Sequence, residues 1–249
     1  MRRFFSSVTD DALFDRVVHA RRSALRFDAT RAVERGVLRG VLEATLRSPS
    51  SFNLLAYRVV LAEDARFRER ISACMSGGAN SERVRAAPLA AVFFADLDAL
   101  SDVDALAARE FAAGSRSSAY LRGLRANAAL FASSRAATVG TFAAGARALT
   151  GVGSGCDGLA WATKGTSLAL MSFMLAATSR GLATYAMEGF DARTLGSVVN
   201  LERGRFAPIC VVAVGYEADA AAAARAPRST RPPLGDIFKV GSAHAPFEE

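Results

Sequence analysis

The longest apolar segment of the chain spans residues 166–179, and almost every side of it is apolar. Large residues such as Leu168 and Phe173 stand among alanines and serines, so no polar face emerges at helical spacing. A helix that is apolar all round lies inside a protein, and this segment therefore predicts a buried central helix. Gly181 follows where a helix commonly ends in a left-handed conformation, and residues 182–187 then predict a strand.

The rest of the chain alternates between helical periodicity and short apolar runs. Apolar positions three and four residues apart predict amphipathic helices, and continuous apolar runs predict buried strands. Residues 76–79 predict a loop, and residues 218–226 a helical or flexible segment. The other expected helices are 10–20, 31–47, 64–75, 121–130, 136–149 and 192–200, and the other expected strands are 58–61, 89–96 and 207–216.

Composition limits the size and class of the protein. With 249 residues, 51% of them hydrophobic, the chain can build one sizeable core, and one domain is expected. The three cysteines are widely spaced and odd in number, which argues against a disulfide framework and against a zinc pattern. The two histidines, His19 and His244, are far apart in sequence, so no metal site is predicted. No segment approaches the ~20 apolar residues that a membrane-spanning helix needs.

The chain is strongly basic, with a formal net charge of +7. Such a net charge suits binding to an anionic partner, or it reflects the compartment in which the protein resides. The arginines are dispersed and aromatic residues do not alternate with them, so no nucleic-acid partner is predicted outside a larger assembly. Residues 1–7 contain two arginines, two serines and no acid, a composition typical of mitochondrial targeting segments. We therefore expect residues 1–9 to be an arm or a short targeting segment and the protein to be mitochondrial, with the cytoplasm as the alternative.

Three short motifs carry the candidate chemistry. Residues 21–27 read Arg-Arg-Ser-Ala-Leu-Arg-Phe, residues 49–53 read Pro-Ser-Ser-Phe-Asn, and residues 186–191 read Ala-Met-Glu-Gly-Phe-Asp. A guanidinium offers a forked pair of donors that suits phosphate oxygens, and a neighbouring hydroxyl adds a third donor. In this order and spacing, the three motifs resemble those of the nitroreductase family of FMN-dependent flavoenzymes.

The resemblance implies a phosphate site built from both ends of the chain. The family's opening motif would assign Arg21, Arg22 and Ser23 to the FMN phosphate. The family's closing R-x-P motif would add Arg231. One position departs from the pattern, because Leu25 stands where a second basic residue is usual. Without the resemblance, the opening motif is also compatible with a solvated basic turn.

The middle motif implies contacts with the flavin ring and its ribityl chain. These contacts would come from Pro49, Ser50, Ser51 and Asn53, which match the family's P-S-S-x-N at its spacing. Leu55 replaces a glutamine that normally hydrogen-bonds the ring, and the loss of such a contact costs about 1 kcal/mol. Without the resemblance, the same residues fit a capped loop between a helix and a strand.

Five further residues complete the implied flavin site. Asn80 and Arg83 fall where family members carry an asparagine and a lysine near the flavin. A cation at Arg83 would stabilise the negative charge of the reduced flavin. Met187, Glu188 and Gly189 would form the loop beside the flavin's N5, where the missing side chain of Gly189 permits close approach. Glu188 and Gly189 are accordingly the residues expected at the catalytic centre.

The resemblance further implies the fold and the reaction. The fold would be an α+β sandwich whose central mixed or antiparallel sheet is flanked by helices, in a single domain over residues 10–249. Because the family's flavin lies at a subunit interface, a homodimer is expected. The reaction would be reduction of nitroaromatic, quinone or similar acceptors by NAD(P)H, in a ping-pong sequence of hydride transfers through FMN. The protein would position and tune this cofactor rather than supply an acid or a base.

Departures from the family's pattern keep two other functions open. With the basic charge, they are compatible with a catalytically degenerate subunit that serves as a structural component of a mitochondrial assembly, such as a ribonucleoprotein. A flavin site reshaped for dehalogenation or desaturation is a third hypothesis. A yellow protein that oxidises NAD(P)H would favour the enzyme, whereas a colourless one that sediments with a large particle would favour the scaffold. The departing residues face or neighbour the flavin in the family, and they are Leu25, Leu55, Ala56, Gly165 and Ser229.

Overall fold

The computed structural model describes residues 11–129, 141, 145, 149 and 157–247 of the chain. The chain divides into two compact units, Met1–Ala218 and Asp219–Glu249. The predicted arm at 1–9 lies outside the described residues, as does most of the helix predicted at 136–149. The single domain predicted over 10–249 stays a prediction.

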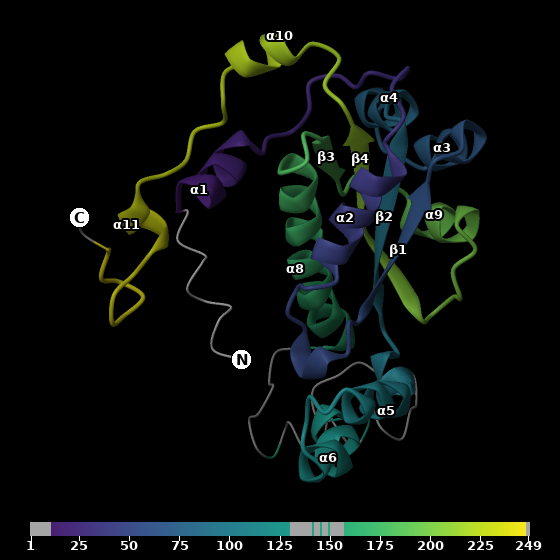
Figure 1. The fold of residues 1–249 in the computed structure, drawn as a ribbon, viewed down its shortest axis with the longest axis vertical. Helices are drawn as coiled ribbons and strands as arrows, with labels where there is room; N and C mark the ends of the chain where they lie inside the picture. The colour runs from purple at the N-terminus through teal and green to yellow at the C-terminus, as the bar shows by residue number, and fades with distance from the viewer. Residues whose placement is uncertain (1–10, 130–140, 142–144, 146–148, 150–156, 248–249) are drawn as a thin grey trace. The chain divides into compact units, whose positions relative to one another are not determined.

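Within the described residues, four strands form one antiparallel sheet in the order β1-β2-β4-β3 (Figure 1). Each strand coincides with a predicted strand to within one residue at either end. The predicted strands are therefore confirmed, and the expected α+β fold with them. They are β1 (Tyr57–Ala62), β2 (Leu89–Asp96), β3 (Ala183–Met187) and β4 (Phe206–Gly215).

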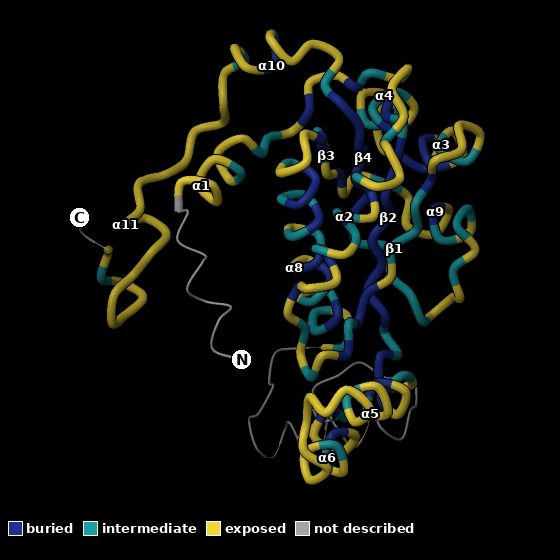
Figure 2. Tube along the Cα trace, in the orientation of Figure 1, coloured by how far each residue is buried: buried dark blue, intermediate teal, exposed yellow. Residues whose placement is uncertain are grey.

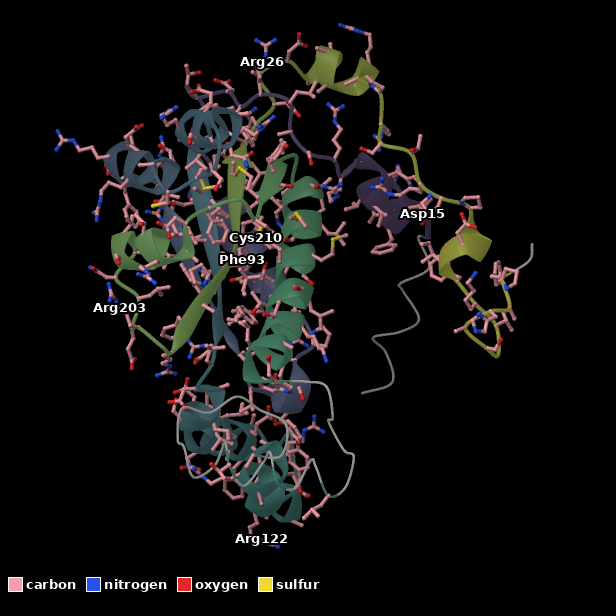
Figure 3. The ribbon with its side chains drawn as sticks, turned by 180° about the vertical axis from the view of Figure 1, so that it is seen from behind. Asp15, Arg26, Phe93, Arg122, Arg203 and Cys210 are labelled. Carbon is pink, nitrogen blue, oxygen red and sulfur yellow. The ribbon has the colours of Figure 1, made fainter. Side chains whose placement is uncertain are left out.

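The two central strands are the most deeply buried part of the sheet. All residues of β2 are buried, and so is the second half of β4 (Figure 2). Phe93 of β2 pairs with Cys210 of β4 in the middle of the sheet (Figure 3). Because helices cover both faces, residues 89–95 are apolar without interruption instead of alternating with polar residues.

Each face of the sheet packs against its own set of helices. One face contacts α3 (Ala65–Ser72), α4 (Gly78–Ala86) and α9 (Ala192–Val198). The other face contacts α2 (Arg35–Thr45) and α8 (Gly158–Thr178). Since successive side chains of a strand point to opposite faces, neighbouring residues of β3 meet different helices.

The central helix α8 is longer and more exposed than the sequence predicts. It begins at Gly158, eight residues before the apolar segment 166–179. Its inner side packs Phe173 edge-on against Phe93, with ring centroids 5.4 Å apart, but Leu168 and Met171 are 48% and 42% exposed. The prediction of burial on every side is wrong for the single chain, because a helix on one face of a sheet has an outer side. No described element of the larger unit fully covers these two residues.

The end of α8 follows the prediction. Gly181 has a φ of +76°, in the left-handed region that glycine adopts without strain. The turn is closed by hydrogen bonds from Gly181 N to Thr178 O (3.0 Å) and from Leu182 N to Ala177 O (2.9 Å). This left-handed turn ends the helix and directs the chain into β3.

Predicted boundaries are also wrong around residues 31–47 and 76–79. The helix predicted over 31–47 begins four residues late, and the guanidinium of Arg31 instead lies 3.4 Å from the centre of the Tyr216 ring. The loop predicted at 76–79 is shorter than expected, since α4 starts inside it. The predicted site residues Asn80 and Arg83 therefore both lie on α4.

A third hydrophobic cluster lies beneath α5 (Val103–Ala112) and α6 (Ser118–Ala129). A short 3₁₀ turn, η2 (Ala99–Asp102), leads into α5 from the end of β2. The sequence predicts α6 as a helix with a later start, and it leaves α5 undefined. Near the N-terminus, α1 (Asp11–Ala20) confirms the first predicted helix.

The smaller unit contains two short helices, α10 (Ala220–Arg225) and α11 (Leu234–Ile237). After α11 the chain folds back on itself through hydrogen bonds from Phe247 N to Phe238 O and from Val240 N to Ala245 O, both 2.9 Å long. None of the described helices, in either unit, has the length and apolar character that a membrane crossing requires.

Candidate functional site

The opening motif runs alongside β3, one of the two edge strands of the described sheet. Ser23 forms a parallel bridge with Thr184, and Ala24 N donates to Thr184 O at 3.0 Å. Arg21 is partly buried and Ser23 is exposed. The fold therefore holds a cation and a hydroxyl within three residues of each other, in an extended segment beside one strand.

A carboxylate that the sequence does not single out holds this segment in place. Glu217 follows β4 and accepts hydrogen bonds from Leu25 N (3.0 Å) and Arg26 N (3.4 Å). Its Oε1 also lies 3.8 Å from Arg22 Nη2, and both side chains of this ion pair are less than a quarter exposed. Arg22, a predicted phosphate ligand, is therefore already paired with a carboxylate within the chain.

The loop after β3 is fixed to the segment before α4. Ser76 N donates to Gly189 O, and Asp191 N donates to Cys74 O, both at 2.8 Å. The Asp191 carboxylate also caps α9, and the hydrogen bond from the Thr194 hydroxyl lowers the pKa of Asp191. The backbone at the predicted catalytic centre is therefore held on both sides.

Gly189 lies beside Asn80 of α4 and Ser76 of the preceding segment. A Cβ atom at this position would lie 3.6 Å from Asn80 Nδ2 and 3.7 Å from Ser76 Cβ, which are ordinary contact distances. The φ of Gly189 is not positive, so its backbone conformation is open to any residue. Neither the backbone nor the described neighbours demand glycine, and the missing side chain leaves room for a bound group beside Asn80.

Arg83 extends from α4 over the ring of Tyr185. Its guanidinium carbon is 4.2 Å from the ring centroid, and its Nη1 is 3.5 Å from Asn80 Oδ1. Its Nε is buried and has no hydrogen-bond partner among the described residues, and the same holds for the Thr184 hydroxyl. A buried polar group left unpaired costs about 1–3 kcal/mol, so a ligand that accepts a hydrogen bond from Arg83 Nε would be favoured here. Thr184, of opposite parity to Tyr185, faces the other side of the sheet.

The middle motif forms a strained turn at the start of β1. Phe52, Asn53 and Leu55 have φ values of +56°, +57° and +47°. Ser50 Oγ accepts from Leu55 N (3.0 Å), and Asn53 Nδ2 donates to Glu110 Oε1 of α5 (2.5 Å). Backbone strain of this kind costs about 1–3 kcal/mol per residue and is typical of ligand-binding loops.

Within one chain, the middle motif lies far from the site at β3. Tyr57, where β1 begins, pairs with Ala95 of β2, which pairs in turn with Ala207 of β4. Thr184 of β3 pairs with Val214 of β4. From Ala207 to Val214 is seven residues, or about 23 Å at ~3.3 Å per residue. The structure brings together the opening motif, α4 and the loop after β3, and it leaves the middle motif toward the other end of the sheet.

Arg231 and Met187, which are also predicted to contact FMN, form other contacts within the chain. Arg231 belongs to the smaller unit, where its Nη1 donates to Ser229 O (3.4 Å) and Thr230 O (3.0 Å). Met187 is buried in the core of the larger unit and pairs with Val211. The Met187 side chain therefore packs inside the protein, whereas Glu188 and Gly189 after it are exposed.

Residues 18–216 match the family model described as the nitroreductase family. The chain belongs to this family. The match covers both the opening motif and the loop after β3, which confirms the resemblance drawn from the motifs. It also covers β1 to β4, so the whole sheet of this nitroreductase-family chain lies within it.

Relatives and solved structures agree with this assignment. An NADH dehydrogenase of Thermus thermophilus is 29% identical over 189 residues, which cover 75% of this chain and 78% of the relative. The nitroreductase-type protein ydfN of Bacillus subtilis superposes with a TM-score of 0.73 and 21% identity, over 92% of this chain and 99% of its own. A nitroreductase-type protein of Exiguobacterium sibiricum 255-15, solved in complex with FMN, gives a TM-score of 0.70 and 19% identity, over 91% and 96% of the two chains. The fold of this nitroreductase-family chain is thereby confirmed.

Three side chains that contact the predicted site residues escape the sequence prediction. Tyr185 belongs to an ordinary strand pattern, and only the packing of α4 on that face brings Arg83 onto its ring. Glu217 and Glu110 belong to no motif, and each contacts a motif that is distant in sequence. The alternation of β3 is the one signal that would place Tyr185 on the same face as α4. No group of three or more His, Cys, Asp or Glu residues in the described part of the chain could hold a metal ion.

Proposed function

We propose that this chain is an FMN-dependent oxidoreductase that takes electrons from NAD(P)H. The observation that carries the proposal is the convergence of Arg21, Ser23, Arg83 and Gly189 around one edge strand, β3. Two cations, a hydroxyl and an exposed glycine suit a phosphorylated ring that gains negative charge. The Exiguobacterium protein of the same fold, solved with FMN, supports this choice of cofactor.

The residues around β3 fit FMN. Arg21 and Ser23 would hold its phosphate through charge-assisted and hydroxyl hydrogen bonds. Asn80 and Arg83 would lie against its ring, where a cation offsets the charge that the ring gains on reduction. The unpaired Nε of Arg83 and the missing side chain of Gly189 beside Asn80 are consistent with a ring bound there. When bound, FMN would supply the hydride chemistry.

We further propose that two copies of the chain complete each site. The middle motif lies about 23 Å from Thr184 along the sheet, which favours its contribution from a second copy. The outer side of α8 exposes Leu168 and Met171, and exposed apolar residues that neighbour each other on one helix are typical of an interface. A homodimer would cover this side and supply Ser50, Ser51 and Asn53 to the partner's site.

The substrates are proposed to be NAD(P)H and a small aromatic or quinone-like acceptor. The name of the Thermus relative, NADH dehydrogenase, supports a nicotinamide donor. The chain's own part is positional, because the fixed backbone at Glu188 and Gly189 presents one exposed face and hydride transfer needs no side-chain acid. Donor and acceptor would use this same face in turn, which favours a ping-pong sequence.

The alternative of a catalytically degenerate structural subunit has no support in the comparisons. The relatives carry the names of a dehydrogenase and of nitroreductase-type proteins. The departures at Leu25, Leu55 and Ser229 remain, and their effect on flavin affinity is open to direct measurement.

The deciding experiment is the visible absorption spectrum of the purified protein, before and after addition of FMN and desalting. We expect retained flavin bands close to one FMN per chain, and oxidation of NADH or NADPH by the loaded protein. A protein that stays colourless at saturating FMN would contradict the proposal and favour the structural role.

A further inference from the structure

We propose that Tyr185 is a positioning residue for Arg83 and thereby sets how strongly the site favours the reduced flavin. The inference rests on the FMN site proposed above. It assigns a role to a side chain that none of the three motifs includes as a ligand. It concerns the orientation of a charge rather than a direct contact with the cofactor.

The partner of the Arg83 cation is an aromatic face. The guanidinium carbon lies 4.2 Å from the Tyr185 ring centroid, inside the ~6 Å range over which a cation is attracted to a ring. Among the described residues, no carboxylate forms a salt bridge with Arg83. A ring face orients a guanidinium without neutralising it, whereas Glu217 offsets the charge of Arg22. The positive charge of Arg83 therefore remains available to a bound group.

The alternation of β3 places Tyr185 under α4. Tyr185 and Met187 pack into the same hydrophobic cluster as Val84, the helical neighbour of Arg83. Leu182, of opposite parity, packs into the cluster on the other face of the sheet. The strand is held in the sheet by β4, so the ring face is part of a rigid surface against which the flexible arginine lies.

The second contact of Arg83 is weak and leaves its orientation to the ring. Arg83 Nη1 reaches Asn80 Oδ1 only at 3.5 Å, and the buried Nε has no described partner. An arginine has many rotamers, and without the ring it would extend into solvent and carry its charge away from the flavin. Loss of the ring should therefore weaken the binding of reduced flavin more than that of oxidised flavin.

The test compares Tyr185→Leu with Tyr185→Phe in FMN-loaded protein. The measurements are the Kd of oxidised FMN and the midpoint potential of the bound flavin. In Tyr185→Leu we expect the affinity ratio of reduced to oxidised FMN to fall about three- to tenfold, a potential about 15–30 mV lower for a two-electron couple. Tyr185→Phe keeps the ring face and should retain the wild-type potential.

A double-mutant comparison separates positioning from a general structural effect. In an Arg83→Met background, Tyr185→Leu should cause no further drop in potential, because the charge that the ring orients is gone. Tyr185→Val, a good strand former, replaces Tyr185→Leu if the leucine variant does not fold. An unchanged potential in the folded variant, or an equal drop without Arg83, would overturn the inference while leaving FMN binding intact. A wild-type chain that binds no FMN would overturn the proposed function, and this inference with it.

Discussion

At the scale of single residues, carboxylates and aromatic rings are contrasting partners for the arginines of this basic protein. Arg22 and Arg205 lie beside carboxylates, which offset their charge. Arg31 and Arg83 lie over the rings of Tyr216 and Tyr185, which hold a guanidinium and leave its charge in place. Pairing with a carboxylate ties segments of the chain together, whereas stacking on a ring leaves the charge of Arg83 available to the proposed flavin.

Arg21→Ala is expected to weaken FMN binding. A charge-assisted contact with phosphate is worth about 1.5–3 kcal/mol, so affinity should fall tenfold or more. The measurement is the flavin retained after desalting, together with the Kd. Arg26→Ala is the matched control, because Arg26 is exposed on the same segment. Equal flavin content in the two variants would sink the phosphate assignment.

Cys210 is expected to make the protein less stable at high pH. The thiol is buried in β4, and burial raises its pKa from 9.0 to about 11. Between these values the unfolded chain has lost the proton that the folded chain keeps, so the free energy of unfolding falls as the pH rises. The slope is about 1.4 kcal/mol per pH unit, or roughly 2–3 kcal/mol in all. Urea unfolding between pH 8.5 and pH 11 measures it.

Cys210→Ala is the control for this pH dependence. Burial also raises the pKa of Tyr57 and of Cys74, and both act in the same direction. The contribution of Cys210 is therefore the difference between the profiles of wild type and variant. Parallel profiles would show that the thiol titrates alike in the folded and unfolded chains.

At the scale of elements, one ion-pair network joins the end of β2 to the start of β4. Asp96 is 1% exposed in its side chain and receives two hydrogen bonds from Arg205, Nε to Oδ1 (3.1 Å) and Nη2 to Oδ2 (3.0 Å). Arg58 Nη2 of β1 bonds Asp102 at 2.6 Å, and Arg205 reaches the same carboxylate at 3.2 Å. Three strands therefore share this network at one end of the sheet.

Asp96→Asn is expected to destabilise the fold by about 1.5–3 kcal/mol, because it removes a buried carboxylate from a forked pair of charged hydrogen bonds. Asp104→Asn is the matched control. Asp104 also bonds an arginine, Arg125 at 2.7 Å, but that pair is largely exposed and should contribute less than about 1 kcal/mol. Denaturant unfolding of both variants checks the prediction, and equal losses would refute the structural role of the network.

The elements that the sequence predicts best are those with a purely local signal. The run 89–95 is apolar at every position, and with Asp96 it forms a strand over residues 89–96, as predicted. The helix at 166–179 is recognised as a helix, but its burial is mispredicted. Local periodicity specifies a conformation, whereas exposure depends on what packs against each side. Leu168 and Met171 would reach a buried state only against another surface.

At the scale of the whole molecule, the proposed homodimer links assembly to cofactor binding. Met171→Asp would place a charge on the outer side of α8 and should shift the protein toward monomers in light scattering, with loss of retained FMN. Ala73→Asp, at an exposed position after α3, is the control and should change neither. A wild-type monomer that retains FMN would contradict the shared site.

The net charge of the molecule does not test where the protein resides, so the mitochondrial location stays a prediction. The formal net charge of +7 is spread along the chain, and arginines of the described residues take part in separate local contacts. The targeting composition at residues 1–9 remains the basis for expecting a mitochondrial protein. A fusion of that segment to a fluorescent reporter would test it.

By itself, the sequence determined the strands, most of the helices and the family, because each depends on residues that are close together or on motifs of fixed spacing. It also singled out Arg21, Ser23, Asn80, Arg83 and Gly189, which the fold does bring to one edge strand. The sequence did not show that these residues lie far from the middle motif within one chain. That distance follows from the register of β1, β2 and β4.

Only the tertiary structure decided which of these residues are engaged within the chain and which are open to a ligand. The pairing of Arg22 with Glu217 and the stacking of Arg83 on Tyr185 each join residues about a hundred or more positions apart. The need for glycine at position 215 is also set by a residue distant in sequence, since a Cβ there would lie 2.5 Å from Pro88 Cδ. Such contacts form when the sheet closes and the helices dock on it. They are therefore set by long-range packing, which local sequence patterns do not encode.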